Sequence, residues 1–202
     1  MPSSLDRRWS APPWRAGAGP DAAEGRRLVA AGRARVVLLD VLAPASVRDT
    51  FTLRLAALRL VVPQRVRDAG GVVCLDTAVW LYAGGPAPAR VDVALPPGRP
   101  RCRVPGLREH QVAYGPQDLW VPLRTDPVTS PARTAVDVAC RRPVAEAVPV
   151  LAVLGVTTGL RPPPVDGLLT GLPGRPGVRG AREALQAWAQ LLSAGPGPPR
   201  VV

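Results

Sequence analysis

The chain has 202 residues, which is enough for one medium-sized domain or two small ones and too few for a large multidomain enzyme. Hydrophobic residues make up 47% of the sequence, so a folded core is expected in spite of 26 prolines and 20 glycines. All 26 basic residues are arginine and only 15 residues are acidic, and the resulting net charge of +11 favours a polyanionic partner.

The N-terminal part of the chain predicts an arm, a helix and a strand. Residues 1–20 are rich in Pro, Ser, Gly and Arg without any period, which is typical of a disordered or extended arm. A helix is expected over 22–31, because Asp21 fits its N-cap and Gly32 fits the left-handed position after its end. The β-branched stretch 33–40 predicts a strand.

Two further helices are predicted before the middle of the chain. The first covers 49–62, begins at Asp49 as a capping residue, and has Arg54 interrupting an otherwise apolar surface. The second covers 77–82 and is capped by Asp76. The short strands expected around and after it are 72–75, 90–95, 102–104, 108–112 and 119–121.

The segment Thr129-Ser-Pro-Ala-Arg-Thr-Ala-Val-Asp137 has a strong helix-start pattern. Ser130 fits the N-cap, and Pro131 fits the first helical position, where its missing amide costs nothing. Arg133 and Asp137 lie four residues apart, which predicts an ion pair on the helix surface. Later helices are expected over 144–154, with a kink or new start at Pro149, over 165–172 and over 180–192.

These elements predict a mixed α/β (α+β) protein. A reduced winged-helix-like part is expected over 21–62, and a small sheet with packed helices is expected over 70–193. The arm at 1–20 precedes them, and a flexible tail over 194–202 follows.

Catalytic groups are sparse in this sequence. His110 is the single histidine; it lies beside Glu109, with no serine or cysteine motif near it, which favours a structural or exposed side chain. Cys74, Cys102 and Cys140 lack paired spacing, so they predict small core residues and neither disulfides nor a zinc site. We therefore expect no enzyme activity, no cofactor and no metal.

Targeting signals are not evident either. Asp6 and two arginines precede any apolar run, so no signal-peptide core is predicted. The longest apolar stretch, 148–160, is shorter than a membrane span and contains a proline and a glycine. A cytoplasmic protein without membrane partners is expected.

Four arginines near the N-terminus form a helix-plus-strand pattern. Arg26 and Arg27 lie on the first predicted helix, and Arg33 and Arg35 lie at the start of the following strand. Guanidinium groups placed in this way can contact phosphates and base edges of duplex DNA. The alternative is a solvated basic face without a ligand.

Four segments agree in order and spacing with one known family: Leu28–Val37, Asp49-Thr50 with Arg54 and Leu58, Thr77–Gly84 and Val128–Ala139. They resemble the AbiEi-type antitoxins of type IV toxin–antitoxin systems over roughly residues 15–195. The stretch Thr129–Asp137 is the most specific part of this resemblance. One departure lies at Leu39-Asp-Val-Leu42, where the family usually has an Arg-Gly-Val-Tyr-like sequence.

The resemblance implies a function. In that family an N-terminal winged helix-turn-helix binds DNA at the system's own promoter, and the following α/β region antagonises the toxin. Many relatives add a C-terminal nuclease-like domain, which this chain is expected to lack because it ends at Val202. The sequence thus predicts an antitoxin-like autoregulator that binds duplex DNA. The alternative is a non-catalytic protein-interaction remnant of a larger nuclease-like protein.

Overall fold

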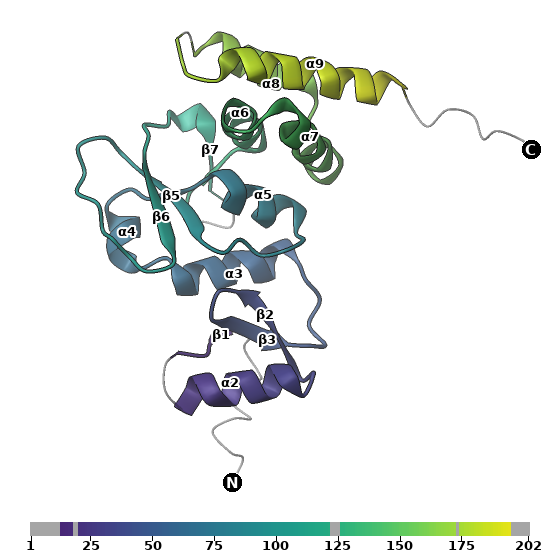
Figure 1. Cartoon of the computed structure of the whole chain (residues 1–202). Helices are drawn as coiled ribbons and strands as arrows, with labels where there is room; N and C mark the ends of the chain where they lie inside the picture. The colour runs from purple at the N-terminus through teal and green to yellow at the C-terminus, as the bar shows by residue number, and fades with distance from the viewer. Residues whose placement is uncertain (1–12, 18–19, 122–125, 173, 195–202) are drawn as a thin grey trace, which may run out of the picture. The chain divides into compact units, whose positions relative to one another are not determined.

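The computed structural model describes residues 13–17, 20–121, 126–172 and 174–194 (Figure 1). They form a mixed α/β protein, which confirms the predicted class. The chain divides into two compact units: unit 1 consists of Met1–Ala113 and Val121–Pro127, and unit 2 of Tyr114–Trp120 and Val128–Val202. The boundary predicted between 62 and 70 therefore lies inside unit 1.

Unit 1 contains two groups of strands, each with helices. Its elements are β1 (Trp14–Arg15), α2 (Pro20–Ala30), β2 (Ala34–Leu38), β3 (Val41–Pro44), α3 (Phe51–Val61), α4 (Gln64–Asp68), β4 (Val72–Val73), α5 (Leu75–Ala83), β5 (Val91–Leu95) and β6 (Leu107–Gln111). The small sheet has the order β1-β3-β2 and lies between α2 and α3 (Figure 1). In the second group, β5 pairs antiparallel with β4 and parallel with β6.

The end of α2 is a Schellman motif centred on Gly32, as the sequence predicted. Gly32 has a φ of 65°, its amide donates to Val29 O at 3.0 Å, and the Arg33 amide donates to Leu28 O at 2.9 Å. The chain therefore leaves the helix in a fixed direction and enters β2 at once. Asp21 was expected as the N-cap, but it lies inside the first turn of the helix.

The predicted strand 33–40 is the first half of a β-hairpin. A two-residue turn at Leu39 and Asp40 joins β2 to β3, and this return strand was missed in the sequence. Part of the predicted arm also belongs to the sheet, because Trp14 pairs with Leu42 and Arg15 with Val41. Within the segment predicted as a disordered or extended arm, 14–15 are thus an extended strand of the sheet, while 1–12 and 18–19 lie outside the described residues.

Thr50, not Asp49, caps α3. The hydroxyl of Thr50 accepts from the Leu53 amide at 3.2 Å. Asp49 instead accepts from Arg54 Nη1 at 3.1 Å, while Arg54 Nε donates to Leu81 O at 3.1 Å. Arg54 is buried in these contacts. The prediction that it interrupts the apolar surface of the helix was therefore wrong.

Two other predictions in unit 1 change, and one helix was not predicted. Cys74 occupies the N-cap position of α5, and Asp76 lies in the first turn, where a negative charge still favours the helix N-terminus. Residues 102–104 form no strand, and Arg103 has a φ of 47°, which is incompatible with a regular strand. The short helix α4 follows Pro63 and had no clear sequence signal.

Unit 2 is mostly helical. Its elements are the 3-10 helix η1 (Pro116–Asp118), β7 (Leu119–Trp120), β8 (Val128–Thr129), α6 (Pro131–Arg141), α7 (Val144–Thr158), α8 (Pro162–Thr170) and α9 (Val178–Ala194). The four α-helices pack around fully buried Trp188, Leu151, Leu154 and Leu169, with α9 touching the other three.

Pro149 does not break α7, which runs through it. The carbonyl that loses its partner belongs to Ala145; because both residues are exposed, water can satisfy it. No single helix among the described residues is long and apolar enough to cross a membrane. Taken together, α7 and α8 are long and apolar enough to span a membrane, but the two helices are bent by 118° relative to each other.

Candidate nucleic-acid interface

The helix α2 buries one face and presents arginines on the rest of its surface. A Cβ atom on Gly25 would lie 2.9 Å from Leu42 Cδ1, so this face packs tightly on the sheet. Leu28 is also buried, one turn further along. Arg26 and Arg27 lie between these two packing positions and are exposed. Both guanidinium groups are thus at the surface of unit 1.

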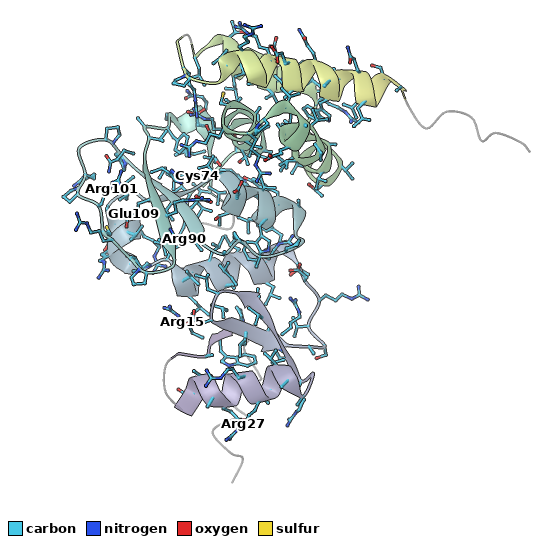
Figure 2. The ribbon with its side chains drawn as sticks, viewed as in Figure 1. Arg15, Arg27, Cys74, Arg90, Arg101 and Glu109 are labelled. Atoms are coloured by element: carbon cyan, nitrogen blue, oxygen red, sulfur yellow. The ribbon has the colours of Figure 1, made fainter. Side chains whose placement is uncertain are left out.

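Arg27 and Arg33 are exposed members of the predicted set on either side of the helix end. The Arg27 side chain is 80% exposed, and the Glu24 carboxylate is 3.7 Å from it, a distance at which an exposed pair contributes little. Figure 2 shows Arg27 on α2. Arg33 is exposed directly after the Schellman motif, and its carbonyl accepts from the Ala45 amide at 3.0 Å. The backbone of Arg33 is therefore held on one side by α2, through its amide, and on the other by the residue after β3, through its carbonyl.

Arg35 differs from the other three. It is half-buried on β2, and its Nη2 donates to Val47 O at 3.3 Å, in the segment that follows β3. This bond ties β2 to that segment. The structure therefore leaves three of the four arginines as exposed surface groups and gives the fourth a structural contact.

The hairpin tip carries no exposed basic side chain. It consists of Leu39, with a φ of 49°, and Asp40. Asp40 Oδ2 accepts from Arg15 Nε at 2.7 Å, while Oδ1 is buried without a hydrogen-bond partner among the described residues. The positive surface of this region therefore centres on α2 and its exit, not on the hairpin tip.

An apolar groove lies beside Arg26. It has a volume of about 440 Å³ and runs along α2 and the adjacent hairpin. Val36 lines it and is 50% exposed. The other lining residues are Ala16, Gly17, Ala22, Gly25, Arg26, Val29, Ala30, Leu39, Asp40 and Leu42. The groove is a surface that a partner protein could cover, so it bears on the alternative function.

His110 is held by a buried partner that the sequence did not identify, which agrees with the structural role predicted for it. Its Nε2 donates to Asp92 Oδ1 at 2.8 Å, and Asp92 is fully buried on β5. Arg108 donates to the same carboxylate from Nε at 2.6 Å and from Nη2 at 3.0 Å. The parallel register explains the cluster: Asp92 lies opposite Arg108, and His110 is two residues further along β6, so its side chain lies on the same face of the sheet.

Burial would raise the pKa of Asp92, but the hydrogen bonds from His110 and Arg108 outweigh it and lower the pKa below its ordinary value. Asp92 is therefore ionised at neutral pH and neutralised by its partners. Among the described residues no group of three or more His, Cys, Asp or Glu side chains is arranged to hold a metal ion. The arrangement is typical of a structural ion pair, and a charged residue within an otherwise apolar strand was its sequence signal.

The predicted pair of Arg133 and Asp137 forms, but it is buried and not on the surface. Arg133 Nε donates to Asp137 Oδ1 at 3.0 Å, and its Nη1 donates to Asp118 Oδ2 at 3.0 Å. Arg175 Nη2 binds the same Asp137 oxygen at 2.6 Å, and the Tyr114 hydroxyl donates to Asp137 Oδ2 at 2.8 Å. We call these five residues the α6 charge network.

Most of the Thr-Ser-Pro-Ala-Arg-Thr-Ala-Val-Asp motif has a structural role, in starting α6 or in the α6 charge network. Ser130 caps the helix by accepting from the Arg133 amide at 3.2 Å, as predicted, and Pro131 opens it. Burial alone would lower the pKa of Arg133, but the charges of Asp137 and Asp118 raise it above its ordinary value. The guanidinium therefore stays charged inside unit 2.

No protein-family model matches the chain, and no curated protein matches it. Among solved structures, the crystal structure of the Rv2827c protein from Mycobacterium tuberculosis is similar. The sequence identity is 22%, the alignment covers 88% of this chain and 70% of that chain, and the TM-score is 0.44. A TM-score at this level is too low to transfer a function.

Proposed function

We propose that the protein is an antitoxin-like transcriptional autoregulator that binds duplex DNA in the cytoplasm. The observation that supports this function is the exposed arginine surface on α2 and its exit, formed by Arg26, Arg27 and Arg33. We refer to these three residues as the α2 arginines. Arg26 and Arg27 project from a helix whose opposite face is packed on a sheet, and Arg33 follows its C-terminal end, so the helix can approach a groove without losing its own packing.

The binding energy would come mainly from phosphates. Each guanidinium that neutralises a phosphate releases condensed counterions, so the affinity falls as the salt concentration rises. A bidentate guanidinium can also read guanine in the major groove. Arg35 would act indirectly in this proposal, by holding β2 to Val47 and thereby fixing the helix exit.

The antitoxin activity is proposed on the resemblance of the segment Thr129–Asp137 to the AbiEi-type family. The α6 charge network keeps this segment folded within unit 2, and it would thereby maintain the surface that antagonises the toxin. No catalytic step is proposed for this activity.

The alternative function is a non-catalytic protein-interaction module. The apolar groove beside Arg26, with the half-exposed Val36 on its wall, favours this function, because exposed apolar grooves are common at protein interfaces. The two functions make different demands on the same region: one needs the α2 arginines, and the other needs the groove.

The deciding experiment is a DNA titration at several salt concentrations. The head variant carries Arg26→Gln, Arg27→Gln and Arg33→Gln together. The control variant carries Arg161→Gln, Arg179→Gln and Arg182→Gln, which are exposed residues of unit 2 and lower the net charge equally. Arg175 is left unchanged in the control because it binds buried Asp137.

We expect the head variant to reduce the slope of log affinity against log salt by roughly two to three units. The control variant should change the slope much less. The duplexes are the protein's own upstream DNA and a scrambled sequence of the same length. Equal losses in both variants would indicate diffuse charge attraction, and no binding by the parent protein at low salt would favour the interaction module.

A further inference from the structure

The loop that joins β5 to β6 carries a concentration of arginines. Within residues 96–106, which we call the basic loop, Arg99, Arg101 and Arg103 are all exposed. Figure 2 shows Arg101 on this loop, with Glu109 on the neighbouring strand β6. Only residues 102–104 of this segment were predicted to form an element, a short strand.

The arginines of the basic loop are not neutralised within the described part of the chain. None of the three forms an ion pair with a described carboxylate. Elsewhere in unit 1, several acidic side chains form ion pairs with other arginines. These pairs are Arg15 with Asp40, Arg54 with Asp49, Arg67 with Asp126 and Arg108 with Asp92. The positive charge of the loop is therefore available to a ligand.

Side chains of β6 hold the backbone of the basic loop. Glu109 Oε2 accepts from the Cys102 amide at 2.8 Å, and Gln111 Nε2 donates to Arg99 O at 3.1 Å. The nearby carboxylate is thus bound to the main chain, between Arg101 and Arg103, and does not pair with either guanidinium. Such anchoring reduces the entropy that the loop would lose when it binds a ligand.

The end of the loop also lies against the hairpin of the small sheet. Gly106 O accepts from the Val91 amide at 2.8 Å, and Gly106 has a φ of 82°. A Cβ atom on Gly106 would lie 3.0 Å from Leu39 Cδ1, so the hairpin tip contacts the loop closely. The hairpin tip itself presents no exposed basic side chain, and the adjacent loop supplies three.

We propose that the basic loop is a second phosphate-binding surface, which contacts the backbone of the same duplex as α2. This inference rests on the proposed DNA-binding function. The ligand class follows from the chemistry of the loop: it contains no aromatic residue, whereas protein-binding hot spots depend on aromatic anchors. The planar guanidinium fork matches phosphate oxygens, and contacts to phosphates carry no sequence information.

The test uses the full chain and three variants of equal net charge. The loop variant carries Arg99→Gln, Arg101→Gln and Arg103→Gln and is compared with the head variant and the control variant defined above. We expect the loop variant to reduce the salt slope by roughly two to three units. The loss should be the same on the upstream and the scrambled duplex, because phosphate contacts do not depend on sequence.

The outcomes separate this inference from the proposed function. If the parent binds DNA and the loop variant behaves as the control variant does, the inference is overturned and the proposed function stands. If the loop variant loses affinity and the head variant does not, the loop is supported and the role of the α2 arginines fails. No binding by the parent protein at low salt overturns both.

Folding of the variants is checked by thermal unfolding. Because the three side chains are exposed and form no ion pair with a carboxylate of the described residues, the loop variant should melt as the parent does. Should the triple variant unfold, Arg101→Gln alone decides, with an expected slope reduction of about one unit. An unchanged slope for this single variant would then overturn the inference.

Discussion

Arg175 and Asp137, 38 residues apart in the sequence, form an ion pair inside unit 2 with 2.6 Å between Nη2 and Oδ1. The same carboxylate binds Arg133 and the Tyr114 hydroxyl, and Asp137 is 1% exposed. A buried charge with three partners is favourable only while all of them are in place. The α6 charge network therefore makes the packing of unit 2 sensitive to single changes.

Asp137→Ala should destabilise the protein by about 3–5 kcal/mol, because it leaves the buried Arg133 guanidinium without one of its two counter-charges. The measurement is urea unfolding followed by circular dichroism. Tyr114→Phe is the matched control, since it removes a single hydrogen bond to the same carboxylate and should cost about 1 kcal/mol. Equal effects of the two changes would contradict the central role of Asp137.

Ser130→Ala should cost about 1 kcal/mol of stability, because the Arg133 amide loses its capping acceptor. Ser130→Thr keeps an acceptor at the same place and should cost less. Thermal unfolding of both variants checks this. A variant Ser130→Ala that melts as the parent does, yet fails to neutralise a toxin in cells, would show that Ser130 serves a ligand and not the helix.

The stability of unit 1 should depend on pH through Asp92. Its folded-state pKa lies below the ordinary value of 3.8, so the ionised form favours the folded state. This contribution is complete above about pH 5 and is lost as the pH falls through the folded pKa. Between about pH 5 and pH 2 the parent should therefore lose more stability than Asp92→Asn. Parallel losses in urea unfolding over this range would contradict the prediction.

Glu109→Ala should make the basic loop more accessible to trypsin, because the Cys102 amide loses its acceptor. We expect faster cleavage after Arg101 and Arg103, measured by mass spectrometry under native conditions. Glu146→Ala, which removes an exposed carboxylate from α7, is the control and should leave these two sites unchanged. Unaltered cleavage rates in Glu109→Ala would show that the anchor does not order the loop.

The purified protein should leave plasmid DNA intact in the presence of Mg²⁺ or Mn²⁺. The described residues offer no cluster that could hold a metal ion, and His110 is occupied by the buried Asp92. Agarose gel analysis is sufficient for this test. Cleavage that co-purifies with the protein and disappears in His110→Ala would instead identify a catalytic site.

Local signals in the sequence predicted local structure well. Ser130 and Pro131 marked the start of α6, and Gly32 marked the end of α2, because caps depend on a few adjacent residues. Where two adjacent residues could both cap a helix, the sequence did not decide between them: Thr50 caps α3, although Asp49 was expected. Asp49 instead pairs with Arg54, which the helical pattern had predicted only as a break in an apolar surface.

Contacts between residues that are far apart in the sequence could not be predicted from it. Arg133 and Asp137 were paired correctly, but their burial depends on Tyr114, Asp118 and Arg175, which come from other elements. The partner of His110 was missed for the same reason, because Asp92 approaches it only through the parallel pairing of β5 and β6. The α2 arginines were located by sequence, while the ordering of the basic loop needed the contacts of β6.

The interleaved order of the two units has a practical consequence for dissecting the protein. A cut before residue 114 separates unit 1 from Asp126, which binds Arg67, and from Pro127, whose carbonyl accepts from the Val73 amide. A cut after residue 127 separates unit 2 from Tyr114 and Asp118. A unit 1 fragment prepared by a single truncation should therefore retain residues up to 127. The unit 2 fragment should begin at residue 114, so that the two fragments overlap.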